Sequence, residues 1–239
     1  MGITHIRLPK NFDLDERLER YAGAIERGAG AYKGRWAEAC CPLAVDGGGA
    51  LRRYGSVHLD LGCGKGAFIC ALASLHPEIN FVAMEKEANV AVIATERAME
   101  ARLPNLRFIL GDADHLPEIF LPGEVGRIYI NFCDPWHKHR QFKRRLTYRG
   151  RLAVYNALLA DGGEVWFKTD NYMLYHFSTF EFDACMERYF STTDLHRSEY
   201  AEGNIMTEYE RYFSNLGQPI YSIRARRNPD CALVPDLSS

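Results

Sequence analysis

A single carboxylate stands just before the most basic segment of this chain. Asp134 comes two residues after the β-branched run IYINF, and beyond Pro135 and Trp136 the chain enters residues 137–151, which contain seven lysines and arginines and no aspartate or glutamate. The whole chain has a formal net charge of −2, so subtracting the +7 of this segment leaves −9 for the rest. An acid at the end of a buried strand, beside a surface for polyanions, suits an enzyme that alters a base within a nucleic acid.

Acidic residues also stand at the ends of three other predicted strands. Asp60 lies in an otherwise apolar strand, Glu85 ends the next strand, and Asp112 ends the third. A buried carboxylate needs a donor or a cation, and an acid at the position of Glu85 can accept hydrogen bonds from a ribose diol. Asp112 either accepts from an adenine amino group or caps the helix that follows it. Together with Asp134, these acids predict a negatively lined pocket.

The loop after the first of these strands is rich in glycine. Gly62, Gly64 and Gly66 let the backbone turn tightly and let a ligand approach the start of the next helix. With Ala67 the loop also fits the dinucleotide pattern G-x-G-x-x-A, so the loop alone leaves an NAD-dependent oxidoreductase open. Four carboxylates would repel the pyrophosphate of NAD but attract the sulfonium and amino groups of S-adenosylmethionine, so charge favours this methyl donor as the cofactor.

The elements that position these residues alternate between strand and helix. This order predicts an α/β fold with a mostly parallel sheet and helices on both faces, in which ligands collect at the carboxyl ends of the strands. The predicted strands are 56–61, 80–85, 105–112, 124–132 and 163–170, with helices at 66–76, 87–102, 149–160 and 172–189, and with tail strands 191–197 and 219–227 around a helix at 207–217. Ahead of them, residues 13–40 predict one or two helices and residues 46–55 a glycine-rich linker.

Composition predicts one main globular domain, because 239 residues with 47% hydrophobic content can bury a full core. We divide the chain into an N-terminal helical extension and linker (1–50), a catalytic domain (51–230) and a C-terminal tail (231–239). The sequence has no membrane span and no signal peptide, which predicts a cytoplasmic protein. Its seven cysteines lack a zinc-binding spacing and are expected to be reduced, and no metal site is expected.

Six motifs in one order resemble the bacterial tRNA (guanine-N7)-methyltransferase family. They are LDLGCGKG, AMEKE, GDAD, DPWHKHRQFKRRL, FKTDN and TEYE, and the similarity runs from about residue 56 to residue 227. The resemblance implies a Rossmann-like class I methyltransferase fold, with a seven-stranded sheet whose last strand is antiparallel. It also implies transfer of a methyl group from S-adenosylmethionine to N7 of a variable-loop guanosine, usually position 46, in tRNA. Relatives of this kind occur as monomers and as homodimers.

The resemblance also implies a role for each matching residue. Asp60, Glu85, Asp112 and Asp134 are similar to the acids that contact the cofactor, and Asp134 also to the catalytic residue. The positions similar to those for substrate recognition are Lys138, Asp170, Thr207, Glu208, Tyr209 and Glu210, and the RNA-contacting segment is similar to Arg140, Lys143, Arg144 and Arg145. The chain departs from the family's usual DPWPKKRH and its preceding serine at Cys133, His137, His139 and Gln141, which puts the path of the loop after Trp136 in doubt.

The chemistry of guanine N7 assigns roles to two acids. N7 has a free lone pair and carries no proton, so Asp134 is expected to stabilise the guanine as it becomes cationic and not to act as a base. Asp170 is expected to accept from guanine N1 or its amino group and so to select guanine over adenine. Trp136 is expected to pack in the core more than to stack on the base. The alternatives are an NAD-dependent oxidoreductase, a non-catalytic tRNA-binding protein, and a methyltransferase for a small molecule or a protein.

Overall fold

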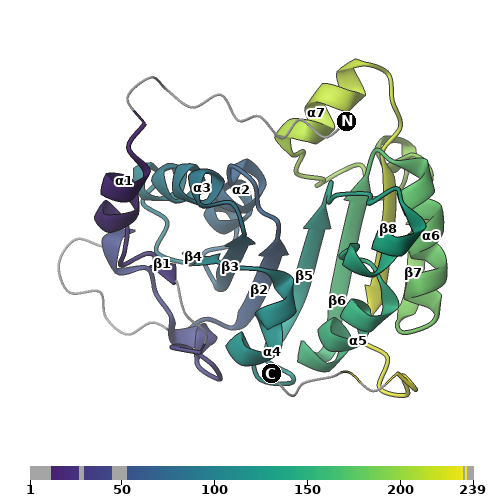
Figure 1. The fold of residues 1–239 in the computed structure, drawn as a ribbon, viewed down its shortest axis with the longest axis horizontal. Helices are drawn as coiled ribbons and strands as arrows, with labels where there is room; N and C mark the ends of the chain where they lie inside the picture. The colour runs from purple at the N-terminus through teal and green to yellow at the C-terminus, as the bar shows by residue number, and fades with distance from the viewer. Residues whose placement is uncertain (1–11, 27–29, 45–52, 234, 236–239) are drawn as a thin grey trace.

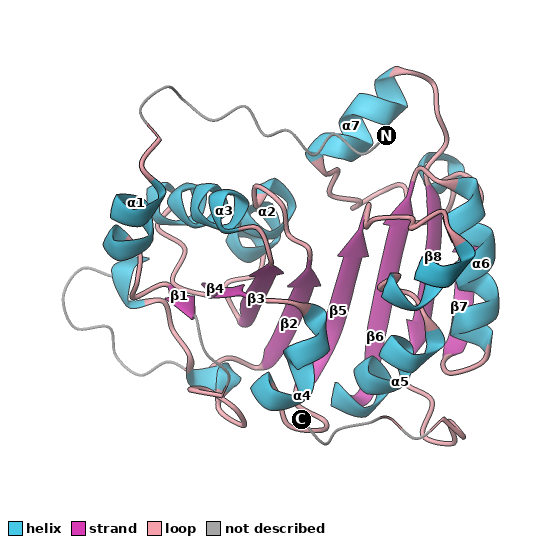
Figure 2. Cartoon of the chain, in the orientation of Figure 1, coloured by secondary structure: helices cyan, strands magenta, loops and turns pink. Residues whose placement is uncertain are grey.

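The computed structural model describes residues 12–26, 30–44, 53–233 and 235, and it has one eight-stranded sheet at its centre (Figures 1 and 2). The strand order is β1-β4-β3-β2-β5-β6-β8-β7. All pairs are parallel except those of β8, which runs antiparallel to both β6 and β7. The strands are β1 Ile25–Glu26, β2 Ser56–Leu61, β3 Ile79–Glu85, β4 Leu106–Leu110, β5 Val125–Asn131, β6 Leu159–Thr169, β7 Glu187–Thr192 and β8 Tyr221–Arg226. The predicted class I arrangement is confirmed, with the short β1 as an eighth strand.

Helices cover both faces of the sheet (Figure 1). The helices α1, α2 and α3 lie on one face and α4, α5 and α6 on the other, while α7 stands above the carboxyl ends of β5 and β6. Their bounds are α1 Leu14–Arg20, α2 Ala67–Leu75, α3 Ala88–Glu100, α4 Leu116–Ile119, α5 Arg149–Leu158, α6 Tyr172–Asp183 and α7 Glu208–Asn215. Short 3-10 helices span Trp36–Glu38, Pro42–Ala44, Ala113–His115, His139–Arg144 and Leu195–Arg197.

Each face of the sheet has its own hydrophobic core, because inward and outward side chains alternate along the buried strands. One core packs α4, α5 and α6 against residues such as Leu59 and Ile130, and the other packs α1, α2 and α3 against residues such as Phe81 and Phe108. The two cores fix the strand ends, and hence the four predicted acids, along one edge of the sheet.

The N-terminal segment differs from the prediction of one or two helices over residues 13–40. Among the described residues of this range, α1 and the 3-10 turn Trp36–Glu38 are helical, and β1 joins the sheet by pairing with β4. Gly30 and Gly34 have φ angles of 91° and 76°, which break a helix. Trp36 is 1% exposed and lies in the core between the sheet and α4. Most of the predicted linker, and the domain boundary placed at residue 50, fall in residues 45–52, outside the described residues.

The second difference concerns the segment after α6. The predicted helix 172–189 ends at Asp183, and the next strand, β7, begins at Glu187, so the predicted strand at 191–197 begins four residues too late. Leu195–Arg197 is a 3-10 helix instead. The predicted helix 207–217 is confirmed as α7, and the predicted strand 219–227 as β8.

Candidate active site

The glycine loop joins β2 to α2 and leaves open space where side chains would otherwise stand. Gly62 and Gly64 have φ angles of 76° and 56°, and a Cβ atom on either would meet nothing within 4 Å. Gly66 is different: with φ of 75°, its Cβ would lie 2.8 Å from the Cβ of Ala94 on α3. Gly62 and Gly64 therefore keep a surface free beside the loop, whereas Gly66 allows α2 to pack closely on α3.

Glu85 holds the loop to the end of β3. Its carboxylate accepts a hydrogen bond from the backbone N–H of Gly64 at 3.1 Å, and also from the N–H groups of Lys86 and Glu87. The side chain is half-buried. The structure thus places the second predicted acid against the glycine loop.

Asp60 is the most deeply buried of the predicted acids. It is 2% exposed at the end of β2, and its Oδ1 atom has no hydrogen-bond partner among the described residues. Burial raises the pKa of Asp60 to about 7, although the nearby Lys168 ammonium acts in the opposite direction. A buried carboxylate oxygen without a partner gains free energy from any cation that reaches it.

Asp112 both caps a helix and stays open to solvent. One carboxylate oxygen accepts from the backbone N–H of Asp114 at 3.1 Å and lies 3.6 Å from the guanidinium of Arg151. Its side chain is 48% exposed. The capping role considered for Asp112 is present, and the exposed carboxylate remains accessible to a ligand.

Asp134 is exposed at the carboxyl end of β5, between two residues in left-handed backbone conformations. Phe132 has φ of 53° and Trp136 has φ of 38°. The ring of Phe132 stacks on that of Tyr209 from α7, with 6.4 Å between centroids. Burial raises the pKa of the Tyr209 hydroxyl, and so do the charges of Asp134, Glu208 and Glu85, which places α7 beside the acid-lined edge.

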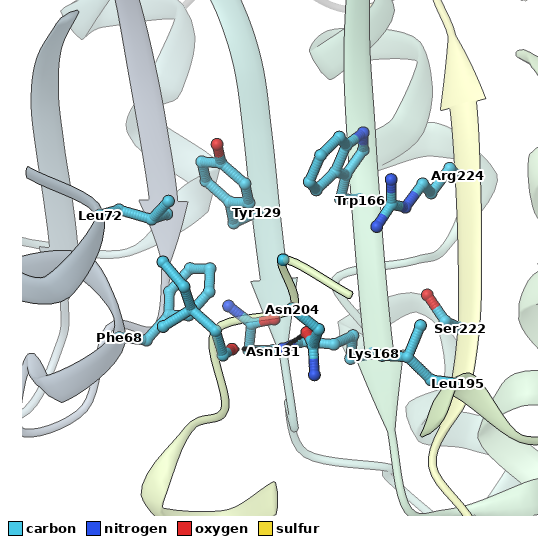
Figure 3. Close-up of a pocket in the computed structure, with 12 residues that line it drawn as sticks. Phe68, Leu72, Tyr129, Asn131, Trp166, Lys168, Leu195, Asn204, Ser222 and Arg224 are labelled. Atoms are coloured by element: carbon cyan, nitrogen blue, oxygen red, sulfur yellow. Dashed lines mark hydrogen bonds between the residues drawn. The ribbon is translucent and has the colours of Figure 1, made fainter. Parts of the chain in front are cut away.

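A buried polar network fixes the base of α7. The Lys168 ammonium on β6 donates to Glu210 at 2.7 Å and to the side chain of Asn204 at 3.0 Å. Glu210 is 0% exposed and also bonds His196 at 2.8 Å. Figure 3 shows Lys168 and Asn204 next to Asn131, on the face of the sheet below Tyr129 and Trp166. The cavity drawn there has a volume of about 50 Å³, which is room for water and not for a nucleoside.

The predicted substrate-binding residues of α7 fall into two groups, one buried in this network and one exposed. Thr207 and Glu210 form a capping box at the start of α7 and are buried, while Glu208 and Tyr209 are exposed. Glu208 pairs with Arg97 on α3 at 3.0 Å. The carboxylate of Glu210 therefore has its partners inside the protein, whereas Tyr209 faces the site. Asp170 follows β6, is half-buried, and has a pKa raised by that burial.

The basic segment, residues 137–151, contains both exposed and buried cations. Lys138, Arg140, Lys143 and Arg144 are exposed, and none forms an ion pair with a carboxylate in the part of the chain that the structure describes. Arg140 and Lys143 lie three residues apart on the 3-10 helix and so share a face. Arg145 is a correction to the predicted phosphate-contacting set, because it is only 4% exposed. Two further cations are paired internally: Arg149 with Glu181 and Arg151 with Asp114.

Trp136 does not pack in the core as expected. It is half-buried and belongs to neither hydrophobic core, although Leu146 and Phe177 nearby pack against one of them. The guanidinium of Arg144 lies 4.1 Å from the centre of its ring, and the ammonium of Lys86 lies 6.0 Å away. The indole thus stands at the surface between two cations, next to Asp134.

Comparison with known proteins agrees with this geometry. A family model described as a putative methyltransferase matches residues 54–223. A tRNA (guanine-N(7)-)-methyltransferase of Lactococcus lactis subsp. cremoris is 41% identical over 219 residues, 90% of this chain and 94% of that protein. One from Brevibacillus brevis is 44% identical over 200 residues, 81% of this chain and 86% of that protein. This chain belongs to the tRNA (guanine-N7)-methyltransferase family.

Solved structures of other methyltransferases resemble the fold of this family member. The 16S rRNA methyltransferase KamB has a TM-score of 0.56 at 17% identity, covering 74% of this chain and 89% of that chain. The antibiotic-resistance methyltransferase Kmr has a TM-score of 0.51 at 16% identity, covering 73% of this chain and 87% of that chain. At such identities the likeness supports the class I methyltransferase fold alone. None of the described helices is long and apolar enough to span a membrane.

The described site fits the cofactor expected of this methyltransferase family, S-adenosylmethionine. Gly62 and Gly64 leave the space that a nucleoside needs, and the unpartnered oxygen of Asp60 offers an anionic partner to a cationic ligand. Glu85 and Asp112 stand at the next two strand ends, where a ribose and an adenine can be bound. The acids and the open loop therefore lie at one edge of the sheet, and their role in cofactor binding stays a prediction.

Three positions near the site were not identified from the sequence of this family member. Lys168 is the buried cation near Asp60, and the side chain of Asn131 lies beside Asp60. The ring of Phe132 stacks on Tyr209 of α7. A lysine within a strand that is otherwise apolar is a signal for Lys168, since burying an ammonium requires a partner. Phe132 gives no such signal, because its left-handed backbone conformation appears only in the folded chain.

The raised pKa of Asp60 predicts that binding of the methyl donor depends on pH in this methyltransferase. Near pH 7 about half of the Asp60 carboxyls are protonated in the free protein. A cationic ligand favours the anion, so affinity for S-adenosylmethionine should rise as pH increases from about 6 to about 8, with release of up to one proton per ligand bound. Calorimetry in two buffers of different ionisation enthalpy measures that proton. Asp60→Asn should abolish the release, and an unchanged release in this variant would assign it to another group.

Proposed function

We propose that this chain transfers the methyl group of S-adenosylmethionine to N7 of a guanosine in tRNA, at position 46 of the variable loop. The observation that carries the proposal is that the exposed Asp134 is followed by four exposed cations, Lys138, Arg140, Lys143 and Arg144, none of which forms an ion pair with a carboxylate of the described residues. The names of the relatives support the same substrate and reaction. Modification of tRNA would place the protein in the cytoplasm, and we expect it to act as a monomer or a homodimer.

The bound cofactor supplies an electrophilic methyl group carried by a sulfonium. The protein holds it with Asp60, Glu85 and Asp112 around the open loop at Gly62 and Gly64. Asp134 keeps its carboxylate next to the position where the purine becomes positively charged, and no proton has to be removed from N7. Asp170 accepts from the N1–H or amino group of guanine, which adenine cannot offer at N1.

Two alternative functions are disfavoured by particular observations. An oxidoreductase would bring a pyrophosphate to the loop, where the buried carboxylate of Asp60 and the nearby Glu85 would repel it. A tRNA-binding protein without catalytic activity would need none of the four acids that stand at the strand ends. Thermal shift assays with NADH and with S-adenosylmethionine separate the first of these alternatives, because only the true ligand raises the melting temperature.

The deciding experiment is methyl transfer to unmodified tRNA. The protein is incubated with labelled S-adenosylmethionine and an unmodified tRNA transcript, and the modified nucleotide is then mapped. We expect one methyl group on N7 of guanosine 46, and no label in a transcript that carries adenosine at that position. Label on another nucleotide, or none with a folded protein, would contradict the proposal.

The unpaired cations predict a steep dependence of tRNA affinity on salt. Each phosphate contact that is lost lowers the slope of log affinity against log salt by about 0.7 to 0.9. The double variant Arg140→Gln/Lys143→Gln should therefore lower the slope by about 1.5 in binding titrations between about 50 and 200 mM salt. Arg188→Gln is the matched control, because Arg188 pairs with Asp183 near the end of α6. An equal change of slope in both variants would contradict a specific role of the basic segment.

A further inference from the structure

One arginine of the basic segment points inward. Arg145 directly follows the exposed Arg144, yet only 4% of it is exposed. Its guanidinium packs against two aromatic rings that also contact each other, 3.8 Å from the centre of Phe142 and 4.3 Å from that of Phe177 on α6. It has no ion pair with a carboxylate among the described residues. A phosphate cannot reach a guanidinium that is enclosed in this way.

The donors of Arg145 are directed at the turn that carries Asp134. Its Nε donates to the backbone carbonyl of Pro135 at 2.8 Å, and a terminal nitrogen donates to the carbonyl of Trp136 at 3.2 Å. The backbone around Arg145 is itself anchored, since its N–H donates to Phe142 and its carbonyl accepts from Tyr148. The guanidinium therefore links the two residues after Asp134 to a fixed part of the chain.

The turn Asp134–Trp136 makes few backbone contacts of its own, although Cys133 before it packs against the core and Arg144 lies over the ring of Trp136. Trp136 adopts a left-handed conformation that is costly for a residue with a Cβ atom and persists only where the surroundings impose it. Pro135 has no N–H to donate. Residues 133–137 form no backbone–backbone hydrogen bond with another part of the described chain. The two hydrogen bonds from Arg145 thus tie the backbone of Pro135 and Trp136 to the end of the basic segment.

We propose that Arg145 is a positioning residue, which holds the Asp134–Trp136 turn in the geometry needed for methyl transfer and does not contact tRNA. The inference rests on the proposed function, because it assigns Asp134 to that reaction. The planar guanidinium donates from two nitrogens in a fixed fork to two successive carbonyls, and an ammonium group cannot reproduce this geometry. A phosphate contact, by contrast, would tolerate lysine, which keeps the charge.

The test compares, in the full-length protein, Arg145→Lys with Arg188→Lys; Arg188 is an arginine on β7 that pairs with Asp183 outside the site. We expect Arg145→Lys to lower kcat for methyl transfer about 10- to 100-fold, with KM for tRNA and the salt dependence of tRNA binding changed less than twofold. Arg188→Lys should retain kcat within about twofold. If Arg145→Lys keeps wild-type kcat, or raises KM while kcat stays the same, the positioning role is wrong.

If Arg145→Lys folds poorly, a second variant tests the same proposal. Phe177→Leu removes one of the two rings that pack against the Arg145 guanidinium, while leaving every charge of the basic segment in place. It should lower kcat in the same direction without changing the salt dependence, and unchanged kcat in this folded variant would overturn the inference. Failure of the wild-type protein to methylate tRNA would instead contradict the proposed function and is scored separately.

Discussion

Replacing Asp134 with asparagine should lower the rate of methyl transfer to tRNA by about 100- to 1000-fold, the range found when one preorganised electrostatic partner of a developing charge is removed. The asparagine side chain has nearly the same shape but no charge, so it cannot stabilise the guanine as it becomes cationic. Asp134 is exposed and forms no ion pair in the described chain, so the substitution should leave the fold intact. Single-turnover measurements with labelled S-adenosylmethionine give the rate directly.

Asp183→Asn is the control for loss of one exposed carboxylate. Asp183 pairs with Arg188 at the end of α6, on the far side of the sheet from α2 and α3, and its loss should leave the rate within about twofold of wild type. Melting temperatures of both variants verify that they are folded. A folded Asp134→Asn variant with near-normal transfer would show that the catalytic role belongs elsewhere.

Lys168→Met should lower the free energy of unfolding by about 3–5 kcal/mol, because it leaves the carboxylate of Glu210 buried without its cation. Glu210 is 0% exposed and its ion pair with Lys168 measures 2.7 Å. Urea denaturation followed by circular dichroism measures the loss. Arg97→Gln breaks the exposed pair with Glu208, also on α7, and should cost less than about 1 kcal/mol. If the two variants lose the same free energy of unfolding, the buried pair stabilises the fold no more than the exposed pair does, and the prediction is wrong.

The same pair predicts how stability depends on pH. Burial alone would raise the pKa of Glu210, but Lys168, His196 and Asn204 together hold it below its ordinary value. A carboxyl with a depressed pKa in the folded state stabilises the fold above its unfolded pKa, and this contribution is lost as pH falls through the folded pKa. The stability difference between wild type and Lys168→Met should therefore shrink in acid.

The alternation of strands and helices was predictable because the sequence patterns that indicate it are local. The apolar runs that become β2, β3 and β5, and the glycine loop between β2 and α2, contain within a few residues the information that fixes them. The four acids follow from the same logic, since each lies at or just beyond the end of one of the strands β2, β3, β4 and β5. The segment Glu187–Thr192 was not predictable in this way, because it becomes β7 only by pairing with β8, more than 30 residues later.

The roles of the remaining site residues depend on which way each side chain points. Composition counts Arg144 and Arg145 as equal charges, although one is exposed and the other enclosed by Phe142 and Phe177. Glu210 was predictable in principle, because Thr207 followed three residues later by a glutamate is the signature of a capping box. Trp136 could not be placed, since its left-handed backbone conformation has no signature in the residue type.

The two-residue strand β1 also bears on how molecules meet one another. It covers part of β4, which would otherwise present a full row of unpaired backbone groups to solvent. Within the described residues β1 comprises Ile25 and Glu26, and this short pair offers a neighbouring chain very little backbone to extend the sheet. The N-terminal segment thereby protects one edge of the sheet from pairing with another molecule and from aggregation. This role is separate from methyl transfer.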